Sequence, residues 1–244
     1  MRKLLWLFLL AASLVQAAPA LVQSKEANVG ATNSLTVTYT SSVTATHDLI
    51  LAVASTISTA PTITEGSETV HTDVSWGGNS NGVYLGIYHV ENTVGGTITW
   101  SSSFGSNGQI VLLAFDYSGL ATSNAFDAKS PIAVGSTLYP TTASVTPSQS
   151  GDLAIGLVSQ TTTTIASWSN GFTQELTGAQ GAGVHGTYAD QTLSGSSSIA
   201  MYATANASDS WACVTALYKA SGSGPPVTSN SALMFLSLNQ RTRK

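Results

Sequence analysis

The stretch Asp48-Leu49-Ile50-Leu51-Ala52-Val53-Ala54-Ser55 is a short and almost wholly apolar run. A second run of the same kind, Asp152-Leu153-Ala154-Ile155-Gly156-Leu157-Val158-Ser159, starts 104 positions later. Continuous apolar runs of this length, bounded by turn residues, are typical of β-strands that are covered on both faces. We therefore expect Asp48 and Asp152 to open equivalent strands.

The residues around the two runs also repeat. Gly82-Val83-Tyr84 matches Gly183-Val184-His185 at an offset of 101. Because the offset hardly changes along the chain, we predict a duplication in which residues 33–119 superpose on residues 137–221. The alternative is a chance resemblance between unrelated strands in a chain rich in Ser and Thr. A further match has an offset of 102: Gln109 to Ser118 with Trp211 to Ala220.

The spacing of strands and turns predicts the fold class. Short strand patterns alternate with turn signals every 8–12 residues, which is typical of an all-β sandwich or jelly roll. Only 8% of the residues are charged, against roughly 25% in an average globular protein. We predict an antiparallel β-sandwich, jelly-roll-like, built from two similar halves. One large sandwich is favoured over two small ones, because strands apolar on both faces need cover on both sides.

The two ends of the chain differ from the middle. Residues 1–17 combine a short basic start, about a dozen apolar residues and a small-residue exit, as in a secretory signal peptide. We expect cleavage after Ala17, with Ala20 as the other candidate, and a secreted, extracellular product. The β-sandwich domain then covers 18–220. Residues 221–244 begin with a Ser/Gly/Pro-rich linker and are expected to form a flexible tail.

Charge and cysteine content exclude some functions. Without the leader, six Lys and Arg face twelve Asp and Glu, and no basic stripe is present, so nucleic acid is not an expected partner. Cys213 is the only cysteine, so an intramolecular disulfide is excluded. A lone thiol in a secreted protein is either buried or reactive. Its apolar strand favours a buried packing role for Cys213.

Two alternating pairs, His71-Thr72-Asp73 and His89-Val90-Glu91, offer metal ligands because residues two apart on a strand share a face. A shared site needs both pairs on one face. The apolar pattern predicts a hairpin that opposes Trp76 to Val83 and Val74 to Leu85. That register puts the two pairs on opposite faces, so we expect no metal site and no cofactor.

The same register predicts a ligand-binding face. It places His71, Asp73, Tyr84 and Tyr88 together on the outer face of the hairpin, and Gly86 leaves a gap between the two rings. Aromatic rings beside hydrogen-bonding groups suit a sugar. The alternative is that a loop or a neighbouring strand covers the tyrosines. The tyrosine pair is not repeated in the second half, so the face is expected in the first half only.

Three motifs in a fixed order resemble a widespread secreted bacterial β-sandwich domain of unknown function. They are Asp48-Leu49-Ile50-Leu51 with its echo at 152–155, Tyr88 followed by 92–99 (NTVGGTIT), and Phe115-Asp116-Tyr117-Ser118-Gly119. The resemblance covers roughly residues 25–220. It implies an exterior, adhesive or glycan-related setting, and it implies no reaction and no catalytic residue.

The sequence leaves three classes of function open. A non-catalytic module that binds an extracellular glycan or cell-surface polymer fits the predicted tyrosine pair. A polysaccharide hydrolase or lyase would need a carboxylate pair, for which Glu65, Glu68 and Glu91 are available. A structural matrix or coat component is the third. The standard hydrolase, metalloprotease, phosphate-loop and calcium-loop motifs are absent from the sequence, so catalysis is the less favoured reading.

Overall fold

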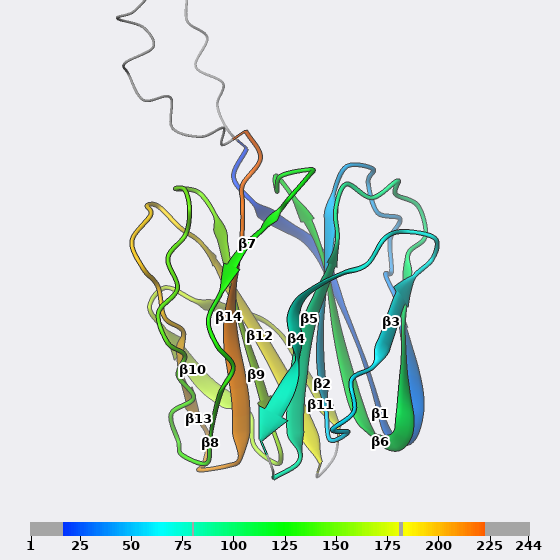
Figure 1. Ribbon diagram of the computed structural model, residues 1–244, viewed down its shortest axis with the longest axis vertical. Helices are drawn as coiled ribbons and strands as arrows, with labels where there is room; N and C mark the ends of the chain where they lie inside the picture. Colours follow the sequence, from blue (N-terminus) through cyan, green and yellow to red (C-terminus); the bar gives the residue numbers. More distant parts are fainter. Residues whose placement is uncertain (1–16, 80, 181–182, 223–244) are drawn as a thin grey trace, which may run out of the picture.

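The computed structural model describes residues 17–79, 81–180 and 183–222. Within these residues it contains fourteen β-strands and no helix, which confirms the predicted all-β antiparallel sandwich of two similar halves (Figure 1). No part of the chain that the structure describes forms a helix able to cross a membrane. The expected leader, apart from Ala17, and the expected tail beyond Gly222 lie outside the described residues.

The first half of the chain forms one six-stranded sheet. Its strands are β1 (Ala20–Thr38), β2 (Asp48–Ser55), β3 (Thr62–Glu65), β4 (His71–Asn79), β5 (Val83–Val90) and β6 (Thr99–Ser118). They are ordered β1-β6-β2-β5-β4, and β3 pairs with the first part of β6. The apolar run at 48–55 thus lies in the middle of the sheet, between β6 and β5.

The second half repeats this arrangement. Its strands are β7 (Phe126–Lys129), β8 (Ala133–Gly135), β9 (Leu153–Gln160), β10 (Ile165–Ser169), β11 (Thr173–Gln180), β12 (Val184–Thr192), β13 (Tyr202–Ala205) and β14 (Trp211–Tyr218). The second sheet is ordered β11-β12-β9-β14-β7, with β8 also on β14, and β10 pairs with β13 separately. Strands β2 and β9, β5 and β12, and β6 and β14 therefore hold matching places.

The two sheets face each other across one apolar core to which both halves contribute (Figure 1). In β6 the inward residues include Val111, Leu113 and Phe115, and in β14 they include Val214 and Tyr218. The ring of Phe115 stacks on that of Tyr188 from β12, with ring centres 3.6 Å apart and planes 19° apart. One shared core makes this a single sandwich, with one sheet from each half.

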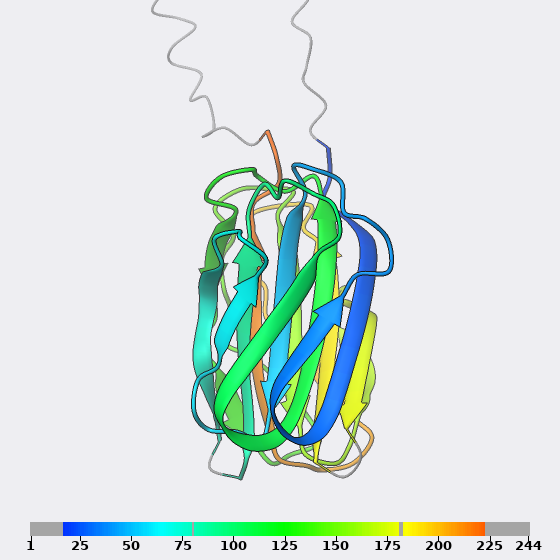
Figure 2. The ribbon, with the colours of Figure 1, turned by 90° about the vertical axis from the view of Figure 1, so that its right-hand side faces the viewer.

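Each sheet is also covered on its outer face. The first part of β6 leaves the main sheet and, with the end of β1 and with β3, lies over β2 and β5 (Figure 2). Trp100 of this cover is fully buried. On the other side, β10 and β13 cover β9 and β14 through side chains such as Trp168 and Ala203. These covers explain why both apolar runs lack polar positions.

The exact alignment of the two halves differs from the expectation. Ile50 of β2 and Leu153 of β9 both face the shared core, whereas Ala154, the match of Ile50 at offset 104, faces the outer cover. A one-residue slip along a strand exchanges its two faces. Ile50 and Leu153, which face the same core, are 103 positions apart, so residues of β2 and β9 that face the same way differ by an odd offset and not by 104. Tyr117 matches Tyr218 at offset 101, and their ladder partners Asp48 and Leu153 match each other at offset 105. Asp48 and Asp152 thus stand at, or directly before, the start of two equivalent strands as predicted, but they do not occupy equivalent positions in them.

Cys213 lies in the middle of β14 and is completely buried against the outer cover. Burial raises the pKa of its thiol above the ordinary value, because the thiolate loses its hydration. The predicted buried packing position is confirmed.

Candidate functional site

The hairpin of β4 and β5 does not have the predicted register. Its ladder is interrupted twice on the β4 side, between Thr72 and Val74 and between Val74 and Gly77. Each β-bulge inserts a residue and turns the side chains that follow it. The simple apolar alternation of the sequence does not reveal such insertions. The observed pairs are His71 with His89, Thr72 with Tyr88, Val74 with Ile87, Gly77 with Leu85, Gly78 with Tyr84 and Asn79 with Val83.

The bulges place Trp76 on the outer face, where the sequence pattern predicted a core position. Its ring stacks on Tyr84 with centres 6.3 Å apart, and its indole N–H donates to the carbonyl of Ile57 at 3.1 Å. A Cβ at Gly86 would lie 3.1 Å from the Trp76 ring and from the Tyr88 hydroxyl. The expected gap between the tyrosines is therefore filled by Trp76, and Tyr88 is buried.

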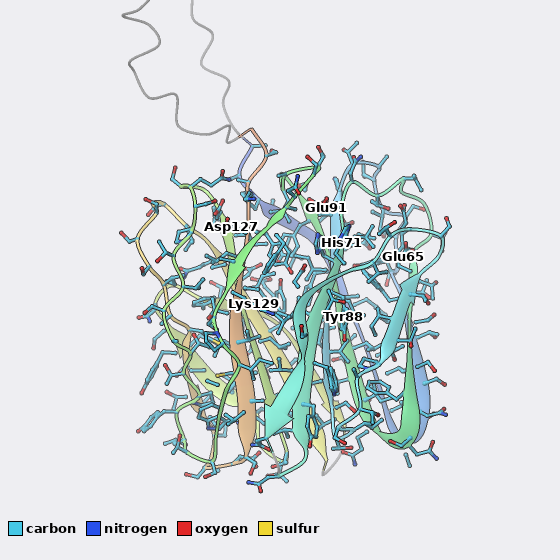
Figure 3. The ribbon with its side chains drawn as sticks, in the orientation of Figure 1. Glu65, His71, Tyr88, Glu91, Asp127 and Lys129 are labelled. Atoms are coloured by element: carbon cyan, nitrogen blue, oxygen red, sulfur yellow. The ribbon has the colours of Figure 1, made fainter. Side chains whose placement is uncertain are left out.

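The four residues predicted to form one exposed face do not lie together. Tyr84 is half-buried and Tyr88 is buried on the outer side of the first sheet. Asp73 is buried on the inner side, against β14 of the opposite sheet. His71 is exposed at the end of the hairpin and stacks on His89 (Figure 3). His71, Asp73, Tyr84 and Tyr88 therefore do not form the single exposed face that the sequence predicted, because Asp73 and Tyr88 are buried on opposite sides of the sheet.

The bulges bring together side chains that the sequence pattern had separated. The ring of His89 contacts Asp73 through Nδ1 at 2.6 Å and Glu91 through Nε2 at 3.2 Å. The second Asp73 oxygen accepts a hydrogen bond from the hydroxyl of Tyr218. His89, Asp73 and Tyr218 are all buried. His71 completes the cluster, since its ring centre lies 4.9 Å from that of His89.

Two pKa values reflect this arrangement. Burial by itself would lower the pKa of His89, but the hydrogen bonds and charges of Asp73 and Glu91 outweigh it and raise that pKa. Burial would raise the pKa of Glu91, but the backbone N–H of Ala125, at 2.6 Å, and the contact with His89 lower it. Both shifts favour the charged forms, which are the protonated ring of His89 and the ionised carboxylate of Glu91.

The three carboxylates considered for glycoside hydrolysis have different surroundings. Glu65 is buried at the end of β3, and burial raises its pKa, with a further contribution from Glu68. The carboxylate of Glu68 accepts a hydrogen bond from the backbone N–H of Val94 at 2.9 Å and so fixes the loop that follows β5. Glu91 belongs to the histidine cluster (Figure 3).

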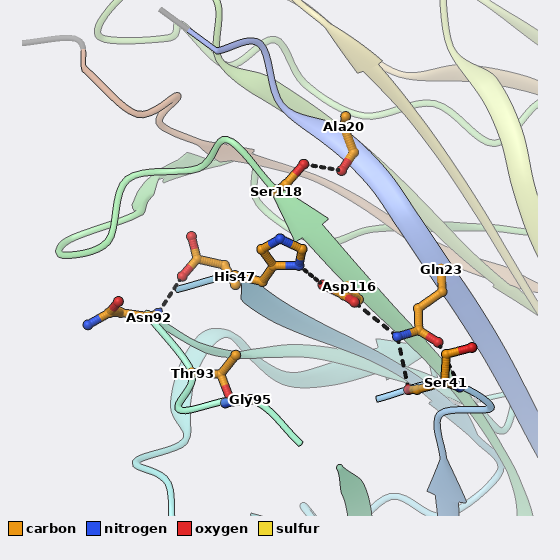
Figure 4. A network of polar contacts seen from close by, with 10 residues as sticks. Ala20, Gln23, Ser41, His47, Asn92, Thr93, Gly95, Asp116 and Ser118 are labelled. Carbon is orange, nitrogen blue, oxygen red and sulfur yellow. Dashed lines mark hydrogen bonds and ion pairs between the residues drawn. The ribbon is translucent and has the colours of Figure 1, made fainter. Parts of the chain in front are cut away.

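A second histidine–carboxylate pair lies at the same end of the first sheet. Nδ1 of His47 is 2.7 Å from a carboxylate oxygen of Asp116, which is completely buried. The other Asp116 oxygen accepts from the side-chain amide of Gln23 at 3.0 Å, and that amide also reaches the carbonyl of Ser41 (Figure 4). This network joins β1, β2 and β6. Sequence reasoning missed it because its members are up to 93 positions apart.

A stacked pair of tyrosines, one exposed and one half-buried, lies on the opposite outer cover. Tyr139 is 48% exposed, and its ring stacks on that of Tyr202 in β13, with centres 5.9 Å and planes 21° apart. Backbone hydrogen bonds of 2.9 Å from Ala203 to Pro140 and from Ala205 to Leu138 hold the chain at 138–140 beside β13. We call the outward residues here the tyrosine face: Tyr139, Thr141, Ser167, Ser169, Tyr202 and Thr204.

Two surface depressions are lined by uncharged residues. One, of about 250 Å³, lies among Gln191, Leu193 and the Ser/Gly-rich turn that follows. The other, of about 330 Å³, lies between Thr56 and Gln109. Neither has a carboxylate or an imidazole in its lining, so neither offers a general acid or base.

Comparison of the chain with protein-family models, with curated proteins and with solved structures finds no match. Function must therefore be inferred from the chemistry of the side chains.

Proposed function

We propose that this chain is a secreted, non-catalytic module that binds carbohydrate at the cell exterior through its tyrosine face. The observation that carries the proposal is the stacked pair of Tyr139, which is solvent-exposed, and Tyr202, which is half-buried. Export is part of the proposal and depends on the leader-like residues 1–17.

The tyrosine face has the composition of a sugar-binding surface. The C–H groups of a pyranose ring pack on aromatic rings, while hydroxyl groups nearby donate to and accept from the sugar. Ser167 pairs with Thr204, and Ser169 with Tyr202, so short hydroxyl side chains surround the rings on a nearly flat β-surface. Its six members include no carboxylate, amine or imidazole, which favours a neutral glycan and offers no general acid or base among the side chains of this face.

Binding at one such face should be weak. Aromatic contacts contribute about 0.5–1.5 kcal/mol per ring, whereas a Kd of about 1 mM already corresponds to about 4 kcal/mol. Two rings and a few hydrogen bonds thus give an affinity near the millimolar range. A polymer with repeated sugars, or several copies of the chain on one surface, would raise the effective affinity without new contacts.

The proposal is tested with a glycan array probed with the secreted protein, followed by titration of each positive glycan. The variant Tyr139→Ala/Tyr202→Ala should lose binding, because both rings are removed from a surface that does not support the core. Tyr84→Ala is the matched control: it removes a half-buried tyrosine from the first half and should leave binding unchanged.

An assay for new reducing ends accompanies the titration. Binding without sugar release supports the module. Release of sugar would indicate an enzyme, and an array without any positive glycan would favour a structural coat component. Equal binding by the parent and by Tyr139→Ala/Tyr202→Ala would contradict the proposed face.

A further inference from the structure

The cluster at the end of the β4–β5 hairpin has the ingredients of a metal centre. His71 and His89 are directly paired across the two strands. Glu91 follows His89 by two positions, and the ligand atoms of the three residues all lie within 4.8 Å of one another. We propose that His71, His89 and Glu91 bind one divalent transition-metal ion, with zinc as the preferred ion.

The contact of His89 with Asp73 prepares one ligand atom. The Asp73 oxygen at 2.6 Å is a hydrogen-bond acceptor when the carboxylate is ionised, so Nδ1 of His89 carries the hydrogen. The Tyr218 hydroxyl holds the other oxygen of Asp73. A buried carboxylate that orients a histidine in this way is the usual support of a metal-binding imidazole. In the neutral ring, the lone pair of Nε2 is then directed toward Glu91.

The separation of His89 and Glu91 fits a shared ion. Nε2 and the nearest Glu91 oxygen are 3.2 Å apart. Two ligands at about 2.0–2.1 Å from a tetrahedral zinc ion are about 3.3 Å apart. The same Glu91 oxygen accepts a hydrogen bond from the backbone N–H of Ala125 at 2.6 Å, which fixes the position of the carboxylate.

The third ligand gives access from solvent. His71 is exposed, whereas His89 is only 2% exposed, so a small rotation of the His71 side chain can bring a ring nitrogen to the ion. Two imidazoles and one carboxylate form a donor set that suits zinc, and three protein ligands leave one position for water. The Glu91 carboxylate would supply a negative charge to the ion.

The second half of the chain provides a comparison within the same fold. At offset 101, His89 and Glu91 match Asp190 and Thr192, and the strand partner of Asp190 is Thr173. No imidazole occupies these matching positions, which lie within the described residues. The proposed centre therefore belongs to the first half, and one ion per chain is expected.

The test uses the secreted protein after treatment with a chelator. Isothermal titration with Zn²⁺ should give one ion per chain, and Co²⁺ should give the strong visible absorption of a four- or five-coordinate ion. His71→Ala should weaken the affinity at least about tenfold, and because His71 is exposed this variant should fold normally. Glu91→Gln keeps the oxygen that accepts from Ala125 and should weaken binding similarly.

His47→Ala is the matched control, because His47 also contacts a buried carboxylate but has no place in the cluster. It should bind the ion as the parent does. The proposal is overturned if the parent shows no saturable binding at one ion per chain. It is also overturned if His71→Ala binds as tightly as the parent, if His47→Ala loses as much affinity as His71→Ala, or if bound Co²⁺ gives only the weak spectrum of six-coordination.

Discussion

The hydroxyl group of Tyr218, near the end of β14, donates a hydrogen bond across the core to the carboxylate of Asp73 in β4. Tyr117, the match of Tyr218 in β6, makes the reciprocal contact and donates to Asp190 in β12. The hydroxyl of Tyr117 also lies 3.1 Å from that of Tyr188. Each sheet thus sends one tyrosine to a carboxylate of the other sheet, at the end of the core where the chain enters and leaves (Figure 1).

The tyrosine at 117 is expected to stabilise the contact between the sheets. Tyr117→Phe removes the hydroxyl and leaves a carboxylate oxygen of Asp190 without this donor, which should cost about 1–3 kcal/mol. Urea unfolding of the parent and the variant measures this difference. Tyr84→Phe is the control, because within the described residues the Tyr84 hydroxyl makes no hydrogen bond; it should change stability by less than about 0.5 kcal/mol. A similar loss in both variants would argue against the cross-sheet role.

Stability is expected to fall as the pH rises through the acid range. Burial raises the pKa of Asp190 to about 6, with a smaller contribution from Glu175. A carboxyl group whose pKa is raised in the folded state contributes its full stabilisation at pH values below its pKa in the unfolded chain. That contribution is lost as the pH rises through the folded value. Asp190 therefore makes the protein more stable near pH 4 than at pH 7.

Asp190→Asn removes this titration while keeping an oxygen that accepts from Tyr117. The variant should gain stability relative to the parent between about pH 4 and pH 7, as measured by thermal unfolding across that range. Asp48 and Asp152, whose pKa values burial raises to about 7 and about 6, leave part of the pH dependence in place. If stability changed with pH in the same way in the parent and in the variant, a contribution of Asp190 to this pH dependence would be excluded.

The two sheets approach closely at Gly178 in β11. A Cβ at this position would lie 2.4 Å from a methyl carbon of Val111 and 3.0 Å from one of Leu113, both in the core. Gly178→Ala should therefore destabilise the fold by about 1–3 kcal/mol through overpacking. Gly105→Ala is the control, since the nearest atom, of Thr59, would be 3.9 Å away. Chemical denaturation of both variants measures the difference in the free energy of unfolding. An unchanged value for Gly178→Ala would show that the two sheets leave room for a methyl group at this position.

Cys213 is expected to resist thiol reagents. It is completely buried, and burial keeps it as the protonated thiol, which is a poor nucleophile. The native protein should therefore react slowly with an aromatic disulfide reagent at pH 8 and fast after addition of denaturant. Rapid labelling without denaturant would mean that β14 opens easily from its cover.

The apolar runs at 48–55 and 152–159 determined by themselves that two strands are buried on both faces, and the spacing of strands and turns determined that the fold is an all-β sandwich. These are local properties, since a run without polar residues cannot face water on either side. The same reasoning determined that Cys213 is buried. The order of the landmarks along the chain likewise indicated the two-half plan, which the matching strand orders of the two sheets bear out.

Only the tertiary structure decided which side chains meet. Two bulges in β4 shift its register by more than one residue, and a one-residue shift is enough to reverse the face of a strand. For that reason Trp76 lies on the outer face between the two predicted tyrosines. For the same reason His71, His89 and Glu91 lie close together beside Tyr218. The pair Tyr139 and Tyr202 also depends on a long-range contact, because a loop and a strand 63 positions apart lie side by side. Apolar alternation reports burial residue by residue, but insertions in a ladder and contacts between distant segments are set by the packing of the whole chain.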